Sequence, residues 1–181
     1  MIVDFFTYSL TVILAFMGLL TGVYFANTSP DEAHAMKKYI PSLQLLTIIL
    51  AYVVLFVYFD FVLSSLIFFL SFAFIYLYWH KRYINTIDYV VFASLLVISS
   101  INKSAHYYMT AIVFVFGILA GILYFVLHTS PKKHISHGHH KHSGKNLTFE
   151  QMSSHVLKKY GFFVLLSIFA YVFANMFCGL I

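Results

Sequence analysis

One ordered set of small and polar residues occurs twice in this chain, and an internal repeat constrains the architecture before any helix is assigned. The first copy reads Gly18-x-Leu20-x-Gly22, Tyr24-Phe25, Thr28-Ser29-Pro30, His34, Lys37-Lys38-Tyr39 and Ala51-Tyr52-Val53. The second copy reads Gly117-x-Leu119-x-Gly121, Tyr124-Phe125, Thr129-Ser130-Pro131, His155, Lys158-Lys159-Tyr160 and Ala170-Tyr171-Val172. The second copy also carries about 20 additional, histidine-rich residues before His155. The shared order favours a duplication over chance similarity between apolar segments.

The balance of apolar and charged residues places the chain in a membrane. Hydrophobic residues make up 61% of the sequence and charged residues only 9%, whereas soluble domains carry about 25% charged residues. The single cysteine, Cys178, excludes an intrachain disulfide and a cysteine-built metal cage. The basic residues that give the net charge of +5 occur mostly in pairs at the ends of apolar segments, which is typical of membrane topology determinants. We therefore expect the lipid bilayer, and no nucleic acid, as a partner.

The apolar runs predict about six transmembrane helices, because about 20 mostly apolar residues are needed to cross the hydrocarbon core. The predicted spans are 5–27, the two halves of 40–79 on either side of Asp60, a short fourth segment that ends at Ile101, 109–128 and 160–181. The fourth segment starts at Tyr83 or Ile87, and a re-entrant or tilted segment is the alternative there. The predicted fold is an all-α, polytopic integral membrane helical bundle built from repeated helical hairpins.

This interpretation gives a single membrane domain that contains three hairpins. Its parts are a first hairpin repeat at 5–59, a central hairpin at 61–101, and a second hairpin repeat at 109–181 with a His-rich insertion at 132–147. The central hairpin carries Lys81-Arg82-Tyr83 but lacks the glycine and Thr-Ser-Pro landmarks. It is either a decayed third copy or an unrelated pair of helices.

The basic residues on the predicted connections define an orientation. The connections after the first, third and fifth spans hold ten of the eleven lysines and arginines, and only Lys103 falls on the other side. Because connections rich in lysine and arginine stay in the cytoplasm, we predict a cell-membrane protein with both termini outside and the His-rich loop in the cytoplasm. A five-span alternative, without the fourth span, would place the His-rich loop outside.

Two helix-start signals fall on these connections. Ser29-x-x-Glu32, with Pro30 at the first helical position, predicts a short helix that runs towards Pro41. Thr148-x-x-Gln151 predicts a second helix start. This second start leads either to an interfacial helix on the inner leaflet or to an inward continuation of the sixth span.

Small residues recur at four-residue spacing on the repeated spans. Gly18 and Gly22 lie on the first span, and Gly117 and Gly121 lie on the fifth. Such stripes let helix backbones approach closely in lipid, where the hydrophobic effect does not drive helix association. We expect the equivalent spans to pack against each other through these glycines, and docking to another subunit or a second copy is the alternative.

The insertion contains the densest group of metal-binding side chains in the sequence: His134, His137, His139, His140 and His142. Neutral imidazole binds zinc, nickel, cobalt and copper, and these spacings let two or three side chains share one ion. The nearest acid is Glu150, so the predicted site has no carboxylate or thiolate to make it rigid. The alternative is a solvated polar insertion that holds no metal.

Enzymes and cation carriers both need residues that this pattern lacks. No His-Glu-x-x-His or Gly-x-Ser-x-Gly motif occurs in the sequence, and the orientation places Asp60 and Asp88 on opposite sides of the membrane. A carrier needs ionisable groups inside its spans, whereas those of this chain fall near predicted span ends: Asp4, Asp60, Asp88, His80, His106 and His128. We therefore predict a non-catalytic scaffold or subunit of a membrane complex, bound to a protein partner or to a second copy. The alternative is a small divalent-metal carrier or channel with a His-rich cytoplasmic loop.

Overall fold

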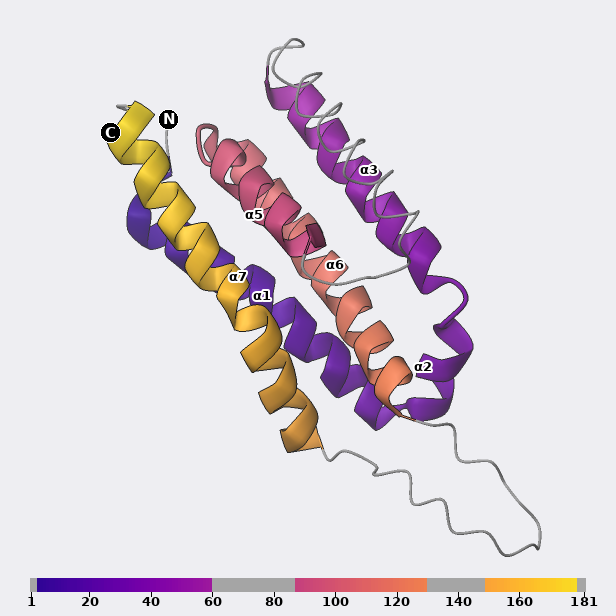
Figure 1. The fold of residues 1–181 in the computed structure, drawn as a ribbon. Helices are drawn as coiled ribbons and strands as arrows, with labels where there is room; N and C mark the ends of the chain where they lie inside the picture. The colour runs from indigo at the N-terminus through magenta and orange to yellow at the C-terminus, as the bar shows by residue number, and fades with distance from the viewer. Residues whose placement is uncertain (1–2, 60–86, 130–148, 179–181) are drawn as a thin grey trace, which may run out of the picture.

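The computed structural model describes residues 3–59, 87–129 and 149–178, and the regular structure in these ranges is helical (Figure 1). The helices are α1 (Phe5–Thr28), α2 (Pro30–Met36), α3 (Ile40–Tyr58), α5 (Ile87–Ser99), α6 (Lys103–His128) and α7 (Phe149–Cys178). Four of them, α1, α3, α6 and α7, are long and apolar enough to cross a membrane. The predicted all-α, multi-pass class is confirmed at this level. The third predicted span and the His-rich insertion lie outside the described residues.

Two central helices, α1 and α6, run side by side in the same direction (Figure 1). Helix α3 packs against α6, whereas α7 packs against α1 and α5. The C-terminal ends of α1 and α6, the starts of α3 and α7, and α2 gather at one end of the bundle, which we call the α2 end. The starts of α1 and α6 lie at the opposite end, near Asn102, which we call the Asn102 end.

Polar side chains fix the starts of both central helices. Asp4 caps α1, because its carboxylate accepts hydrogen bonds from the Thr7 backbone N–H at 2.8 Å and from the Thr7 hydroxyl at 2.7 Å. These bonds favour the charged carboxylate and so lower the pKa of Asp4. Asn102 caps α6 by accepting from the backbone N–H groups of Ser104 and Ala105. The cap starts α6 at Lys103, six residues before the predicted fifth span begins at Met109.

Loss of the Asn102 cap is expected to weaken the folded state. Asn102→Ala leaves the first backbone N–H groups of α6 without their side-chain acceptor, which should cost about 1 kcal/mol of unfolding free energy. Asn102→Asp keeps an acceptor at this position and serves as the matched control. Denaturant unfolding of both variants in mixed micelles measures the difference, and equal stability of the two would contradict the capping role.

A proline separates α2 from α3 at the α2 end, whereas the corresponding part of α7 is continuous. Pro41 lies in the first turn of α3, where its ring and missing N–H prevent a continuous helix with α2. The corresponding residue of the second copy is Phe162, and α7 runs unbroken through this point from Phe149 to Cys178. Of the two alternatives for the second helix start, the structure thus shows a helix that continues without a break into the last predicted span. Ser29 precedes α2 as expected, but its side chain makes no capping hydrogen bond.

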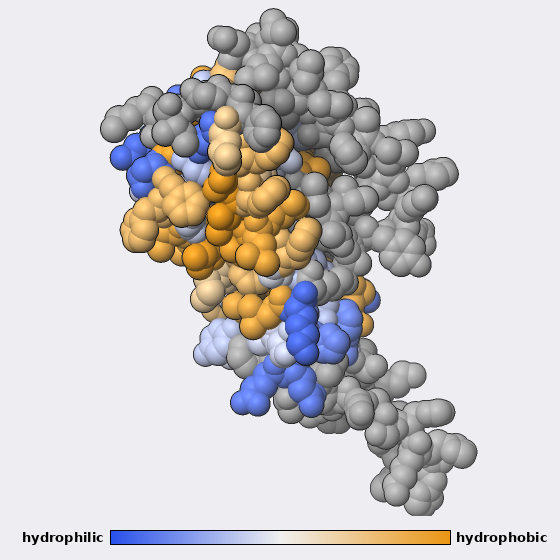
Figure 2. Space-filling model, turned by 60° about the vertical axis from the view of Figure 1, so that its left-hand side comes forward, coloured by the Kyte–Doolittle hydropathy of each residue, from blue (hydrophilic) through white to orange (hydrophobic). Residues whose placement is uncertain are grey.

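The described surface is largely apolar outside the helix ends. In the most apolar stretch of each helix, 72% of the residues of α6 are buried, against 33% for α3 and 29% for α7. Figure 2 shows hydrophobic side chains gathered over the middle of one face, with hydrophilic residues below them and at their upper left. An apolar belt between polar ends suits contact with lipid acyl chains.

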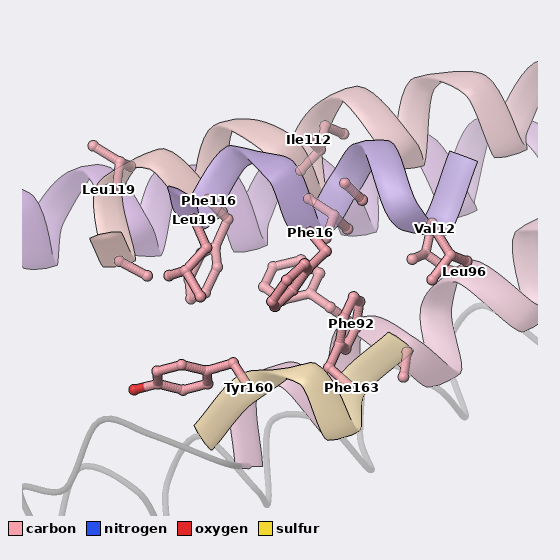
Figure 3. Packing of buried hydrophobic residues seen from close by; sticks show 14 of the residues in the cluster. Val12, Phe16, Leu19, Phe92, Leu96, Ile112, Phe116, Leu119, Tyr160 and Phe163 are labelled. Carbon is pink, nitrogen blue, oxygen red and sulfur yellow. The ribbon is translucent and has the colours of Figure 1, made fainter. Parts of the chain in front are cut away.

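The core lies where α5 and α7 meet the central pair. Phe16 and Leu19 of α1 face Phe116 of α6, and Phe92 of α5 reaches towards them (Figure 3). The rings of Phe92 and Phe116 are tilted at 49° with their centroids 4.6 Å apart. These contacts hold α5 to the bundle.

Candidate functional site

The four glycines of the repeated motif lie at the contact between α1 and α6. A side-chain Cβ placed on Gly18 would collide with the backbone carbonyl of Phe114, and one placed on Gly22 would collide with that of Ile118. A Cβ on Gly121 would collide with the carbonyl of Leu19. The two backbones therefore touch over successive turns, at positions where only glycine fits.

These glycine contacts are reciprocal between the two copies. Ile118 and Gly121 are the second-copy counterparts of Leu19 and Gly22. Gly22 meets Ile118, and Gly121 in turn meets Leu19. Likewise Gly18 meets Phe114, while Gly117 lies near Ala15, the counterpart of Phe114. Exchange of this kind, in which residue i meets j and j meets i, is the property of a two-fold interface.

The helices that follow α1 and α6 in the chain are also exchanged between the two central helices. Helix α3 follows α1 in the chain but packs against α6, whereas α7 follows α6 but packs against α1. Each of these two later helices therefore covers the central helix that it does not follow in the chain (Figure 1).

The two-fold pattern breaks at the Asn102 end, where a buried histidine joins three helices. His106 of α6 has no exposed surface. Its Nε2 lies 2.7 Å from the Thr11 hydroxyl of α1, and its Nδ1 lies 3.2 Å from the hydroxyl of Ser99, the last residue of α5. The His106 counterpart in the first copy is Thr7, so the first copy has no equivalent of this arrangement. We call His106, Thr11 and Ser99 the His106 cluster.

A stack of aromatic rings links this cluster to α7. The Tyr8 ring stacks on the His106 ring with centroids 5.2 Å apart, and on the Tyr171 ring at 4.1 Å. The Tyr8 hydroxyl donates to the Ser167 carbonyl at 3.2 Å and lies 3.1 Å from the Ser167 hydroxyl. The Tyr171 hydroxyl donates to the Val3 carbonyl. The Asn102 end of α1 is thus held by polar contacts on both sides.

His106 is the one buried ionisable residue among those whose burial the structure describes, apart from tyrosines. Its neighbour Ser99 is also completely buried and donates to the Leu96 carbonyl at 2.9 Å. A serine in this position has no access to a substrate, so the pair can exchange protons but cannot attack an external molecule. The chemistry open to the cluster is proton binding and hydrogen bonding.

The predicted metal ligands His134, His137, His139, His140 and His142 lie outside the described residues. Within residues 3–59, 87–129 and 149–178, no three His, Cys, Asp or Glu side chains come together in a group that could hold a metal ion. His34, His128 and His155 belong to the α2 end, where the His-rich insertion joins α6 to α7.

His106 was expected only as a residue near a span end, and its partners were not predicted. Thr11 and His106 are 95 positions apart, so no local spacing connects them. The available signal was chemical, since a histidine next to an apolar run needs hydrogen-bond partners if it is buried.

Together, the four apolar helices and the closed central pair define the class: this chain is a multi-pass helical membrane protein. Comparison with protein-family models, curated proteins and solved structures gave no match.

Proposed function

We propose that this protein is a non-catalytic scaffold or subunit of a membrane complex. The observation that carries this proposal is the backbone contact between α1 and α6, which leaves no space for an aqueous path between the two central spans. The described charged side chains also lie towards the ends of the helices, and the one farthest from an end, Lys158, is the tenth residue of the 30-residue α7. A bundle with this interior is suited to holding its shape and presenting surfaces to lipid and protein.

We also propose that the bundle arose by duplication of a hairpin. The reciprocal contacts of Gly22 and Gly121, and the exchange of α3 and α7 between the copies, support it. Two hairpins of the same orientation form a parallel repeat, with its axis along the membrane normal.

The proposed orientation places the α2 end in the cytoplasm and both chain termini outside. Lys37, Lys38 and Lys158 belong to the α2 end, whereas Lys103 belongs to the Asn102 end. This distribution agrees with the bias of lysine and arginine towards cytoplasmic connections.

A divalent-metal carrier is the second candidate, and the five histidines between positions 134 and 142 favour it. In this role the His-rich segment would collect zinc, nickel, cobalt or copper ions on the cytoplasmic side. The path across the bilayer would then have to avoid the closed α1–α6 contact.

Zinc flux into proteoliposomes separates the two candidates. Intact protein is reconstituted with an entrapped zinc indicator, beside protein-free liposomes and a variant that lacks residues 132–143. The scaffold proposal expects the same zinc entry in all three samples, together with a partner or second copy present at fixed ratio in native mass spectra. Saturable zinc entry with intact protein would overturn it and favour the carrier.

A further inference from the structure

We propose that His106 is a proton-binding site, which keeps the Asn102 end of the bundle closed while neutral and opens it when protonated. This inference is independent of the scaffold proposal, because it depends only on the contacts of one buried side chain.

The His106 cluster has fewer protons than hydrogen-bond contacts when the imidazole is neutral. The Thr11 hydroxyl donates to the Tyr8 carbonyl at 2.8 Å, and the Ser99 hydroxyl donates to the Leu96 carbonyl at 2.9 Å. Each hydroxyl has one proton, and a neutral imidazole has one N–H. Two hydroxyl–imidazole contacts and two hydroxyl–carbonyl contacts therefore share three protons. One hydroxyl must direct its proton to a ring nitrogen instead of to its backbone carbonyl. A neutral His106 satisfies both ring nitrogens in this way and connects α1 to α5 and α6.

The described contacts of His106 include no counter-charge. Among the described residues, the groups that face His106 are the Tyr8 ring and Thr11 hydroxyl of α1, the Ser99 hydroxyl and Leu96 backbone carbonyl of α5, and the Tyr107 ring of α6 at 6.5 Å. None of these groups carries a full negative charge. From α7, Ser167 and Tyr171 contact Tyr8 rather than the imidazole. Within residues 3–59, 87–129 and 149–178, the exposed charged side chains of this end are Asp4 and Lys103, and the Asp4 carboxylate is bonded to Thr7.

The position of the ring along α6 also disfavours a positive charge on the imidazole. His106 lies in the first turn, close to backbone N–H groups that carry partial positive charge. A buried imidazolium there would gain a second donor for the two hydroxyls but would have no anion beside it. Removing an unpaired charge from water costs more than one added hydrogen bond contributes. A proton taken up from water therefore favours an arrangement in which the ring leaves its buried place, and the α5–α6 turn separates from α1.

The test compares the accessibility of two adjacent positions in the full chain. Ala105 is completely buried and Ser104 is exposed. Ala105→Cys and Ser104→Cys are made separately in a Cys178→Ser background and reconstituted in lipid nanodiscs. Each is then labelled with a thiol reagent at about pH 7.5 and about pH 5, on either side of the imidazole titration. The ratio of the two labelling rates removes the intrinsic pH dependence of the thiol reaction.

The ratio should rise by up to about 30-fold on acidification, the factor by which protonation of a water-exposed imidazole favours the open state between these pH values. His106→Gln retains a donor and an acceptor but does not titrate, so its ratio should change by less than about twofold. His128→Gln, at the opposite end, should keep the full rise. A flat ratio with His106 present, or an unchanged rise in His106→Gln, would overturn the proposal.

A second measurement does not depend on folding of the His106→Gln variant. Side-chain ¹⁵N spectra of the intact protein in lipid bilayers report the protonation of His106 directly, with Thr11→Val identifying its signal. The proposal expects a neutral ring near neutral pH and a charged ring under the acidic conditions that open Ala105→Cys. A charged ring near neutral pH, or a neutral ring in the opened state, would contradict it.

Discussion

Replacing Gly22 with alanine is expected to lower the free energy of unfolding by about 3 kcal/mol, the upper part of the range for an overpacked core. The new Cβ would collide with the backbone carbonyl of Ile118, and a carbonyl in the middle of a helix cannot turn aside as a flexible side chain can. The two central helices must therefore move apart over this turn. Gly121→Ala should have an effect of similar size, because its Cβ would collide with the Leu19 carbonyl.

Alanine variants of two other glycines serve as controls for this measurement. A Cβ on Gly117 would lie 2.9 Å from the Leu19 backbone nitrogen, a milder conflict, so Gly117→Ala should cost about 1 kcal/mol. A Cβ on Gly161 of α7 would meet nothing within 4 Å, so Gly161→Ala should be neutral or should stabilise the helix by up to about 1 kcal/mol. Denaturant unfolding in mixed micelles ranks the variants. Equal stability of Gly22→Ala and Gly161→Ala would contradict the close contact of α1 and α6.

Truncating Phe92 to alanine is expected to cost about 3 kcal/mol of unfolding free energy, as for other buried phenylalanines. Phe92 is 1% exposed and packs on the equally buried Phe116. Its loss would leave a cavity between α5 and α6 that the bilayer cannot fill (Figure 3).

The matched control is Phe6→Ala, which removes the same side chain from a position that is 77% exposed on α1. This change should alter stability by less than about 0.5 kcal/mol. Similar losses for Phe92→Ala and Phe6→Ala would mean that α5 is not docked on the core as described.

The membrane class and most of the described helices could be predicted because they depend on local composition. The apolar run after Asp4 gave the first span to within one residue of α1, and the run after Tyr39 gave the start of α3. The start of α6 was missed because Lys103, Ser104 and His106 interrupt the apolar pattern. The capping residue Asn102 was the signal that marked the true start.

Contacts between distant segments could be predicted only in part. The four-residue spacing of the glycines pointed to close helix packing, but the reciprocal register of Gly22 and Gly121 required the assembled bundle. The His106 cluster could not be predicted, because Thr11 and Ser99 reach the ring from separate helices. The break between α2 and α3, which α7 lacks, could have been predicted, because the proline at position 41 corresponds to Phe162 in the second copy.

The proposed location in the cell membrane and the proposed orientation are tested most directly by labelling two exposed serines at opposite ends of the bundle. Ser104 lies at the Asn102 end and Ser154 at the α2 end. Each is changed to cysteine in a Cys178→Ser background, and intact cells are treated with a membrane-impermeant thiol reagent. The account predicts that Ser104→Cys is labelled and that Ser154→Cys reacts only after the cells are opened. Labelling of Ser154→Cys but not Ser104→Cys in intact cells would contradict it.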